Sequence, residues 1–142
     1  MSKAAAQPGP SADAADPAGL GLRVQVRVEF AVGQRLGPGK IDLLEAIGQS
    51  GSITAAGRRL GMSYRRAWLL VADLNRLFDA PVVETVAGGA HGGGAKLTEI
   101  GQRLVAAYRA LERDTREMAE AKLAPFCARC PNGRPVPSRE GP

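Results

Sequence analysis

The segment from residue 51 to residue 75, GSITAAGRRLGMSYRRAWLLVADLN, constrains the fold of this chain more than any other. Ser52 is a good N-cap residue, and Gly61 stands where a helix needs a left-handed C-cap. We therefore expect a helix of about two turns over Ile53–Leu60, followed by a second helix that Ser63 caps. A short helix, a tight turn and a longer helix in succession are typical of a helix-turn-helix unit.

The second helix should bury one stripe of side chains and expose the opposite one, because its apolar residues recur at steps of three and four. The apolar stripe consists of Ala67, Leu70, Val71, Leu74, Leu77 and Phe78. The outward stripe consists of Arg65, Leu69, Ala72 and Arg76. We expect this outward stripe to be the face that reads a partner.

The charges around the turn all have one sign. Between Thr54 and Leu70 the charged residues are Arg58, Arg59, Arg65 and Arg66. Basic residues in the first turn of a helix oppose its macrodipole at a cost of about 0.3–1 kcal/mol, so another interaction must justify them. A solvated surface usually mixes charge signs, whereas a purely cationic one suits DNA phosphates and guanine edges.

Two aromatic residues near the start of the second helix have different expected roles. Tyr64 lies in the first turn, where its hydroxyl can reach a phosphate or a base. Trp68 lies at the edge of the apolar stripe, and we expect it to anchor the core. Stacking of both rings on single-stranded bases is the alternative. The expected DNA contacts on this unit are Arg58, Arg59, Ser63, Tyr64, Arg65 and Arg66.

The rest of the pattern predicts a mainly α domain with a small antiparallel sheet, in the order strand, three helices, hairpin, helix. The span Leu22–Phe30 alternates apolar and polar residues, as a strand with one buried face does. A helix should run from Pro38 to about Gly48, and spans 82–86 and 95–97 should form a hairpin. We expect the first strand to join this hairpin in one sheet, which gives a winged helix-turn-helix.

The loop of residues 88–94, GGAHGGG, is interpreted as the tip of the wing. It lacks the GK[ST] ending of a phosphate-binding loop, and no helix starts directly from it. Its glycines would let backbone amides approach a phosphate, with His91 and Lys96 supplying contacts. A solvent loop without function is the alternative. His91 is the chain's only histidine, which disfavours a His-dependent catalytic or zinc site.

Residues 50–75 resemble the DNA-binding domain of the ModE family of molybdate-responsive bacterial transcription regulators. The Ser-Tyr-basic-x-Ala-Trp string at Ser63–Trp68 makes the resemblance specific. Val82–Gly101 resembles the family's glycine-rich wing and the L-T-x-x-G start of its long helix, and Leu22–Phe30 resembles its leading strand. The resemblance spans residues 22–123 and implies a homodimer on duplex DNA.

Full-length members of that family carry two molybdate-binding modules after the DNA-binding domain. This chain continues for about twenty residues beyond its long helix, too few for one such module. We therefore expect no molybdate site and no cofactor within the chain. A response to molybdate would then require a separate sensor protein, or competition with a full-length regulator for its sites.

Residues 99–124 should form one long dimerisation helix with a heptad-like apolar stripe, here called the seam. Five basic residues balance five acidic ones along it, which suits a protein contact better than a DNA contact. A two-fold dimer would place two recognition helices about 34 Å apart on an inverted repeat. Part of the seam should cover the domain's own core, which leaves the rest for a partner. The seam consists of Ile100, Leu104, Ala107, Leu111, Met118 and Ala121.

Cys127 and Cys130 form a single C-x-x-C, which is half of a four-cysteine zinc site. A reduced tail without function is the favoured interpretation. The alternative to DNA binding is a protein-interaction or metal-sensing adaptor that acts through the long helix and this cysteine pair. An enzyme is disfavoured, because no nucleophile has a base and an orienting partner at a suggestive spacing.

Charge and composition agree with one basic domain. A net charge of +5 and a pI of about 9.8 favour a polyanionic partner. No apolar stretch approaches membrane-spanning length, and residues 1–20 lack the apolar run of a secretory signal, so we expect a cytoplasmic protein without membrane contact. Residues 1–20 and 125–142 should be disordered tails, which leaves 21–124 as the folded domain.

Overall fold

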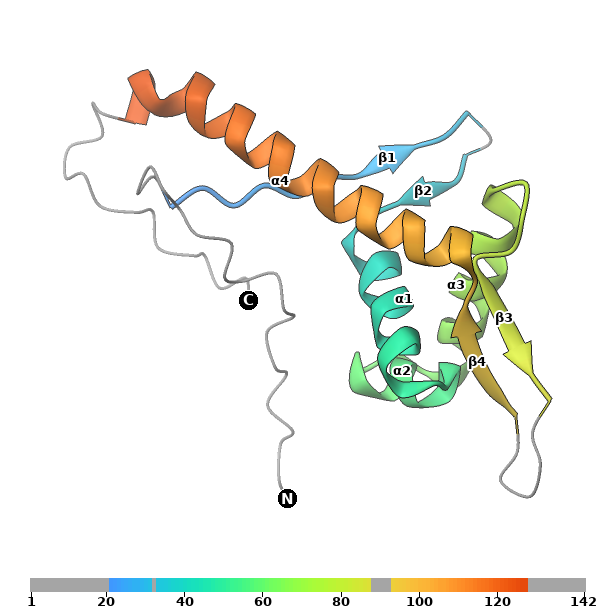
Figure 1. Ribbon diagram of the computed structural model, residues 1–142. Helices are drawn as coiled ribbons and strands as arrows, with labels where there is room; N and C mark the ends of the chain where they lie inside the picture. Colours follow the sequence, from blue (N-terminus) through green and yellow to red (C-terminus); the bar gives the residue numbers. More distant parts are fainter. Residues whose placement is uncertain (1–20, 32, 88–92, 128–142) are drawn as a thin grey trace, which may run out of the picture.

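The computed structural model describes residues 21–31, 33–87 and 93–127 (Figure 1). It confirms a mainly α fold with small antiparallel sheets and a long C-terminal helix. No helix in these residues is long and apolar enough to cross a membrane. The elements in chain order are β1 (Val28–Glu29), β2 (Arg35–Leu36), α1 (Pro38–Ser50), α2 (Ile53–Arg59), α3 (Tyr64–Leu77), β3 (Val83–Val86), β4 (Gly94–Leu97) and α4 (Glu99–Cys127).

Helix α1 lies at the centre of the domain and packs against α2, α3, α4 and β4. Pro38 occupies its first turn, where a missing N–H costs nothing, and Gly51 ends it in the left-handed region with φ 71°. The predicted helix is thus confirmed, with its end two residues later than expected. The core around α1 consists of Leu36, Ile41, Leu43, Leu44, Ala46, Ile47, Ile53, Ala56, Ala67, Val71, Leu74, Val82, Val83, Ala95 and Tyr108.

The wing forms as predicted, but the first strand does not join it. β3 and β4 pair antiparallel as a separate hairpin, with Val83 opposite Leu97. β1 pairs instead with β2, an element that the sequence did not indicate, with Val28 opposite Leu36. The chain reverses between these strands through Gly33, whose φ of 78° favours glycine. The prediction of one three-stranded sheet is therefore wrong.

The segment that leads into β1 is extended, although only Val28–Glu29 is hydrogen-bonded as a strand. Its side chains alternate between half-buried and exposed from Leu22 to Phe30, as the period-two pattern predicts. It runs beside α4 (Figure 1), where the Tyr108 hydroxyl donates to the Val26 carbonyl. Burial, above all, raises the pKa of the Tyr108 hydroxyl, which keeps this donor protonated.

The start of α4 lies very close to the wing. Thr98 caps the helix, because its Oγ1 accepts from Gly101 N at 3.0 Å and donates to Pro81 O at 2.7 Å. Gly101 passes the Val82 carbonyl so closely that a Cβ atom would lie 2.1 Å from that oxygen. The L-T-x-x-G string therefore has a packing role: it joins the start of α4 to Pro81 and Val82, the residues just before the wing strand β3.

Helix α4 ends later than expected. It continues through Pro125 to Cys127, although the tail was expected to begin at residue 125. Only its last residues follow the proline, so the lost backbone hydrogen bond falls at the helix end. Part of the seam covers the core, as expected: Leu104 packs against it, together with Val105 and the core residue Tyr108. The other seam residues, Ile100, Ala107, Leu111, Met118 and Ala121, are exposed.

From its place among the α4 charges, Arg109 was expected to belong to a balanced outer surface. It lies instead in a mostly buried cluster. Its guanidinium contacts Asp42 at 2.7 Å and Glu45 at 2.8 Å on α1, and Glu112 at 2.7 Å on α4. These four side chains are mostly buried, with exposed fractions between 17% and 31%. The cluster ties α4 to α1 and so fixes how the long helix crosses the domain.

Candidate nucleic-acid interface

Helices α2 and α3 are held together at a short turn. Ser52 caps α2 by accepting from Ala55 N, and Ser63 caps α3 by accepting from Arg66 N, both at 3.1 Å. Gly61 takes a φ of 70° in the turn between them. The two predicted caps and the glycine turn are confirmed, and α2 ends at Arg59, one residue earlier than expected.

The close packing of the two helices depends on Gly57 in α2. A Cβ atom at this position would lie 2.8 Å from the Cβ of Ala67 in α3. Met62 N also donates to Gly57 O at 2.8 Å, which closes the turn. The pair therefore behaves as one rigid unit that presents the first turn of α3 to solvent.

The arginines of this unit fall into two groups. Arg58, Arg65 and Arg66 are exposed, and within the described residues none of them forms an ion pair or a side-chain hydrogen bond. Arg59, in contrast, donates to Gln49 Oε1 on α1 at 2.7 Å. Arg76, at the far end of α3, pairs with Asp73 at 2.9 Å. Uncompensated positive charge is thus concentrated around the start of α3.

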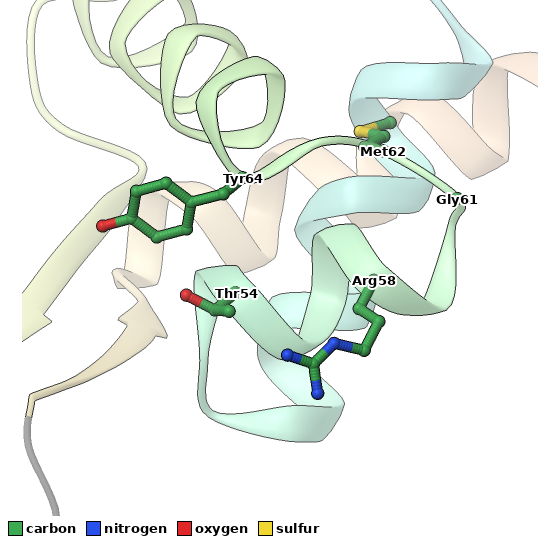
Figure 2. Close-up of a pocket in the computed structure, with 5 residues that line it drawn as sticks. All are labelled: Thr54, Arg58, Gly61, Met62 and Tyr64. Carbon is green, nitrogen blue, oxygen red and sulfur yellow. The ribbon is translucent and has the colours of Figure 1, made fainter.

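A shallow, open hollow of about 400 Å³ lies beside these arginines, between α2 and the start of α3. In Figure 2, Thr54 and Arg58 project from α2 and Tyr64 projects from the start of α3, with Gly61 in the turn between the helices. The lining offers two hydroxyls and a guanidinium as hydrogen-bond donors. The Tyr64 ring points away from Arg58 (Figure 2), so Thr54 and Arg58 are the pair suited to an anionic oxygen group such as a phosphate.

Trp68 is not a core anchor, so this prediction is wrong. Its side chain is 37% exposed, and its ring lies 6.0 Å from that of Tyr64, centroid to centroid. It lines a second hollow of about 380 Å³ between α3 and the wing strand. The ring stands at the edge of the buried stripe, and β3 covers it only in part. That second hollow is lined by Trp68, Val71, Ala72, Asn75, Pro81, Val83, Glu84 and Thr85.

Asn75 connects α3 to the wing. Its Oδ1 accepts from Val82 N at 2.9 Å and from Val83 N at 3.1 Å, and its Nδ2 donates to Val83 O at 3.1 Å. One side chain thus satisfies three backbone groups of a buried segment. The wing therefore keeps a fixed position relative to α3.

Comparison with known proteins agrees with this geometry. Residues 39–102 match the bacterial regulatory helix-turn-helix proteins of the lysR family. This part of the chain is a lysR-type helix-turn-helix domain. It begins in α1, contains α2, α3 and the wing, and ends in the first turn of α4.

The curated relatives of this helix-turn-helix domain include ModE proteins. The chain is 51% identical over 80 residues to the molybdenum-pterin-binding protein MopB of Rhodobacter capsulatus, covering 56% of this chain and 30% of MopB. It is 48% identical over 88 residues to the molybdenum transport protein ModE of Azotobacter vinelandii, covering 62% of this chain and 33% of that protein. It is 37% identical over 89 residues to the DNA-binding transcriptional dual regulator ModE of Escherichia coli strain K12, covering 61% of this chain and 34% of that protein.

These alignments confirm the resemblance to ModE over the helix-turn-helix domain. The chain spans about a third of the length of the curated relatives it matches. The relation therefore concerns their DNA-binding region.

The structure brings Arg58 and Tyr64 together at one hollow, and Arg65 and Arg66 follow Tyr64 in the first turn of α3. Not all of the predicted contact residues are equally free. Ser63 uses its oxygen as the cap of α3. Lys96 pairs with Glu84 across the wing at 3.2 Å, so its charge is partly compensated. His91 lies outside the described residues, as do Cys130 and the side chain of Cys127. No three metal-binding side chains gather in the described part of the chain.

Sequence reasoning missed two residues of the helix-turn-helix domain. Thr54 lines the hollow beside Arg58, and Asn75 positions the wing. Neither has a charge or a motif that marks it. Thr54 could have been found from its place in the first turn of α2, because that turn faces the start of α3. Asn75 is a polar residue close to the buried stripe of α3, which was the available signal.

Proposed function

We propose that this chain is a DNA-binding transcription regulator of the ModE type, which inserts α3 into the major groove of duplex DNA. The uncompensated guanidinium groups of Arg58, Arg65 and Arg66 carry this proposal. Arginines without an anionic partner at the start of an exposed helix are available for phosphates and base edges. The Escherichia coli relative, which bears the name of a DNA-binding transcriptional regulator, supports the same conclusion.

The residues of the interface would divide into two roles. Arg65, Arg66 and Tyr64 would meet base edges, because the N-terminal residues of a recognition helix enter the groove. Arg58 and Thr54 would hold a phosphate in the hollow beside them. The other predicted contacts are Ser63, next to Tyr64 in the groove, and three residues that would hold the backbone, Arg59, His91 and Lys96.

We also propose that the chain binds as a homodimer through the outer half of α4. Leu111, Met118 and Leu123 are between 41% and 58% exposed there, and Phe126 is 73% exposed. Large apolar side chains on one helix suit a helix–helix contact. A two-fold pair would read an inverted repeat, and a regulator of this kind would work in the cytoplasm, where bacterial DNA lies.

Selection of duplexes from a random DNA pool at about 150 mM salt tests this function, since affinity without a stated salt level means little. Arg103→Ala is the matched control, because Arg103 is exposed on α4 ahead of the proposed dimer contact and has no partner among the described residues. Enrichment of an inverted repeat by both proteins supports the proposal. Enrichment of a single half-site would refute the dimer, and no enrichment would refute sequence-specific binding.

A further inference from the structure

An exposed apolar surface lies in the middle of the outward stripe of α3. The Leu69 side chain is 52% exposed, and it belongs neither to the core nor to the residues packed against the core. Ala72, almost one turn further along, is exposed as well. Arg65 and Arg76 stand on the same stripe on either side of these two residues. Leu69 therefore faces outward between cations and has no packing role in the chain.

The exposed large apolar side chains of the described residues gather in two places. Ile100, Leu111, Met118, Leu123 and Phe126 lie on α4. Tyr64, Trp68, Leu69 and Val86 lie on α3 and on the wing strand β3. The first set suits a contact with protein. The second set coincides with the surface that we propose for DNA, so its partner should be a base and not a protein.

The major groove offers one apolar group to such a side chain, the C5-methyl group of thymine. Leu69 suits it better than its neighbours. The Trp68 ring already contacts the Tyr64 ring, and it also lines the hollow between α3 and β3. Ala72 is short and lies further from the start of the helix, which is the end that enters the groove. Leucine extends further from the helix than alanine and carries two terminal methyl groups.

We propose that Leu69 is a specificity-determining residue that reads the methyl group of a thymine in the major groove. This inference rests on the proposed function, in which α3 enters that groove. Leu69 follows Arg65 by four residues, or about 6 Å along the helix, which corresponds to about two base steps of 3.4 Å. The thymine should therefore lie within about two base pairs of the base pair that Arg65 contacts.

Removal of single methyl groups from the DNA tests the inference. The probe is the most enriched duplex of the selection, prepared with deoxyuridine in place of each thymine in turn, which deletes one methyl group and preserves the base pairing. At one of these positions, the thymine that Leu69 reads, the duplex with deoxyuridine should bind wild-type protein about fourfold more weakly than the duplex with thymine, as expected for one buried methyl group. For Leu69→Ala, thymine and deoxyuridine at that position should bind equally.

Gln102→Ala is the control, because Gln102 is exposed at the start of α4, its side chain forms no hydrogen bond among the described residues, and it belongs neither to the proposed DNA contacts nor to the proposed dimer surface. It should preserve the fourfold difference. Thermal unfolding of Leu69→Ala checks that the variant is folded, which we expect because alanine is a good helix former at an exposed site. Should it not fold, Leu69→Met, which keeps an apolar but differently shaped side chain, should reduce the difference without abolishing it.

The outcomes separate the inference from the function on which it rests. Sequence-specific binding that is insensitive to every methyl deletion would overturn the inference alone. A methyl effect that persists unchanged in folded Leu69→Ala would also overturn it, because another group would then be reading the methyl. Failure to enrich any sequence would overturn the proposed function and this inference together.

Discussion

The side-chain amide of Asn75 in α3 holds the backbone of Val83 at the start of the wing, accepting from its N–H and donating to its carbonyl, both at 3.1 Å. The same oxygen accepts from Val82 N. Val82 and Val83 are buried, so few other groups can satisfy these backbone atoms. Asn75 is thus the side chain that links the recognition helix directly to the wing.

Asn75→Ala should lower the free energy of unfolding by about 1–3 kcal/mol, because buried backbone groups would lose their partners. Urea unfolding followed by circular dichroism measures the change. Gln102→Ala is the control, since Gln102 is exposed at the start of α4 and its side chain forms no hydrogen bond among the described residues. It should change stability by less than about 0.5 kcal/mol. Equal effects of the two variants would contradict the role of Asn75.

The helix caps were predictable from sequence, whereas this connection was not. Ser52 and Ser63 act on backbone groups three residues away, so local sequence contains both partners. Asn75 meets its partners only after the chain has turned back beyond α3. The β1–β2 pairing was not predicted for a related reason: β2 has only two residues, which are too few to show a period-two pattern.

Gly101→Ala should destabilise the protein by about 3 kcal/mol, although alanine is ordinarily the better helix former. The new Cβ would collide with the Val82 carbonyl, which also accepts from Thr98 N and cannot easily move. Gly39→Ala is the matched control, because a Cβ at Gly39 in α1 has no neighbour within 4 Å. It should be neutral or raise stability by up to about 0.5–1 kcal/mol. Thermal unfolding of both variants measures the two changes in stability. Similar shifts of the melting temperature would refute the proposed collision between the new Cβ and the Val82 carbonyl.

Arg109→Met should lower the free energy of unfolding by about 2–4 kcal/mol, somewhat less than the roughly 3–5 kcal/mol for a fully buried pair, because this cluster is partly exposed. The substitution leaves Asp42, Glu45 and Glu112 facing one another without their cation. Urea unfolding at pH 7 gives the loss. Arg113→Met, on the same helix but exposed, should change stability by less than about 0.5 kcal/mol.

The pH dependence of this loss provides a second check. Hydrogen bonding to Glu45 raises the pKa of Arg109 above its ordinary value, despite the opposing effect of burial. A raised folded pKa means that the stabilising effect of Arg109 is complete below its unfolded pKa and is lost only when the pH rises above it, so Arg109 stays charged throughout the usual range. The difference in stability between wild type and Arg109→Met should therefore stay constant from about pH 7 to about pH 9. A difference that disappears over this range would contradict the cluster.

The cationic character of the interface was predictable, but which cations are free was not. Arg58, Arg65 and Arg66 follow from the absence of acidic residues around them in the sequence. Arg59 and Lys96 were expected to be equally available, yet they meet Gln49 on α1 and Glu84 on β3. Both pairings depend on how separate elements pack, which a local charge pattern does not reveal.

The free arginines should differ in what they contribute to DNA binding. Arg66→Ala should weaken binding to the selected site by about 1–3 kcal/mol and less to unrelated duplexes, as expected for a base contact. Arg58→Ala should weaken binding to all duplexes alike and reduce the slope of log affinity against log salt by about one, because it removes a phosphate contact. Fluorescence anisotropy on both kinds of duplex at several salt concentrations distinguishes them, with Arg103→Ala as the unaffected control. If Arg66→Ala and Arg58→Ala lost affinity equally on every sequence, the division between base reading and backbone contact would be wrong.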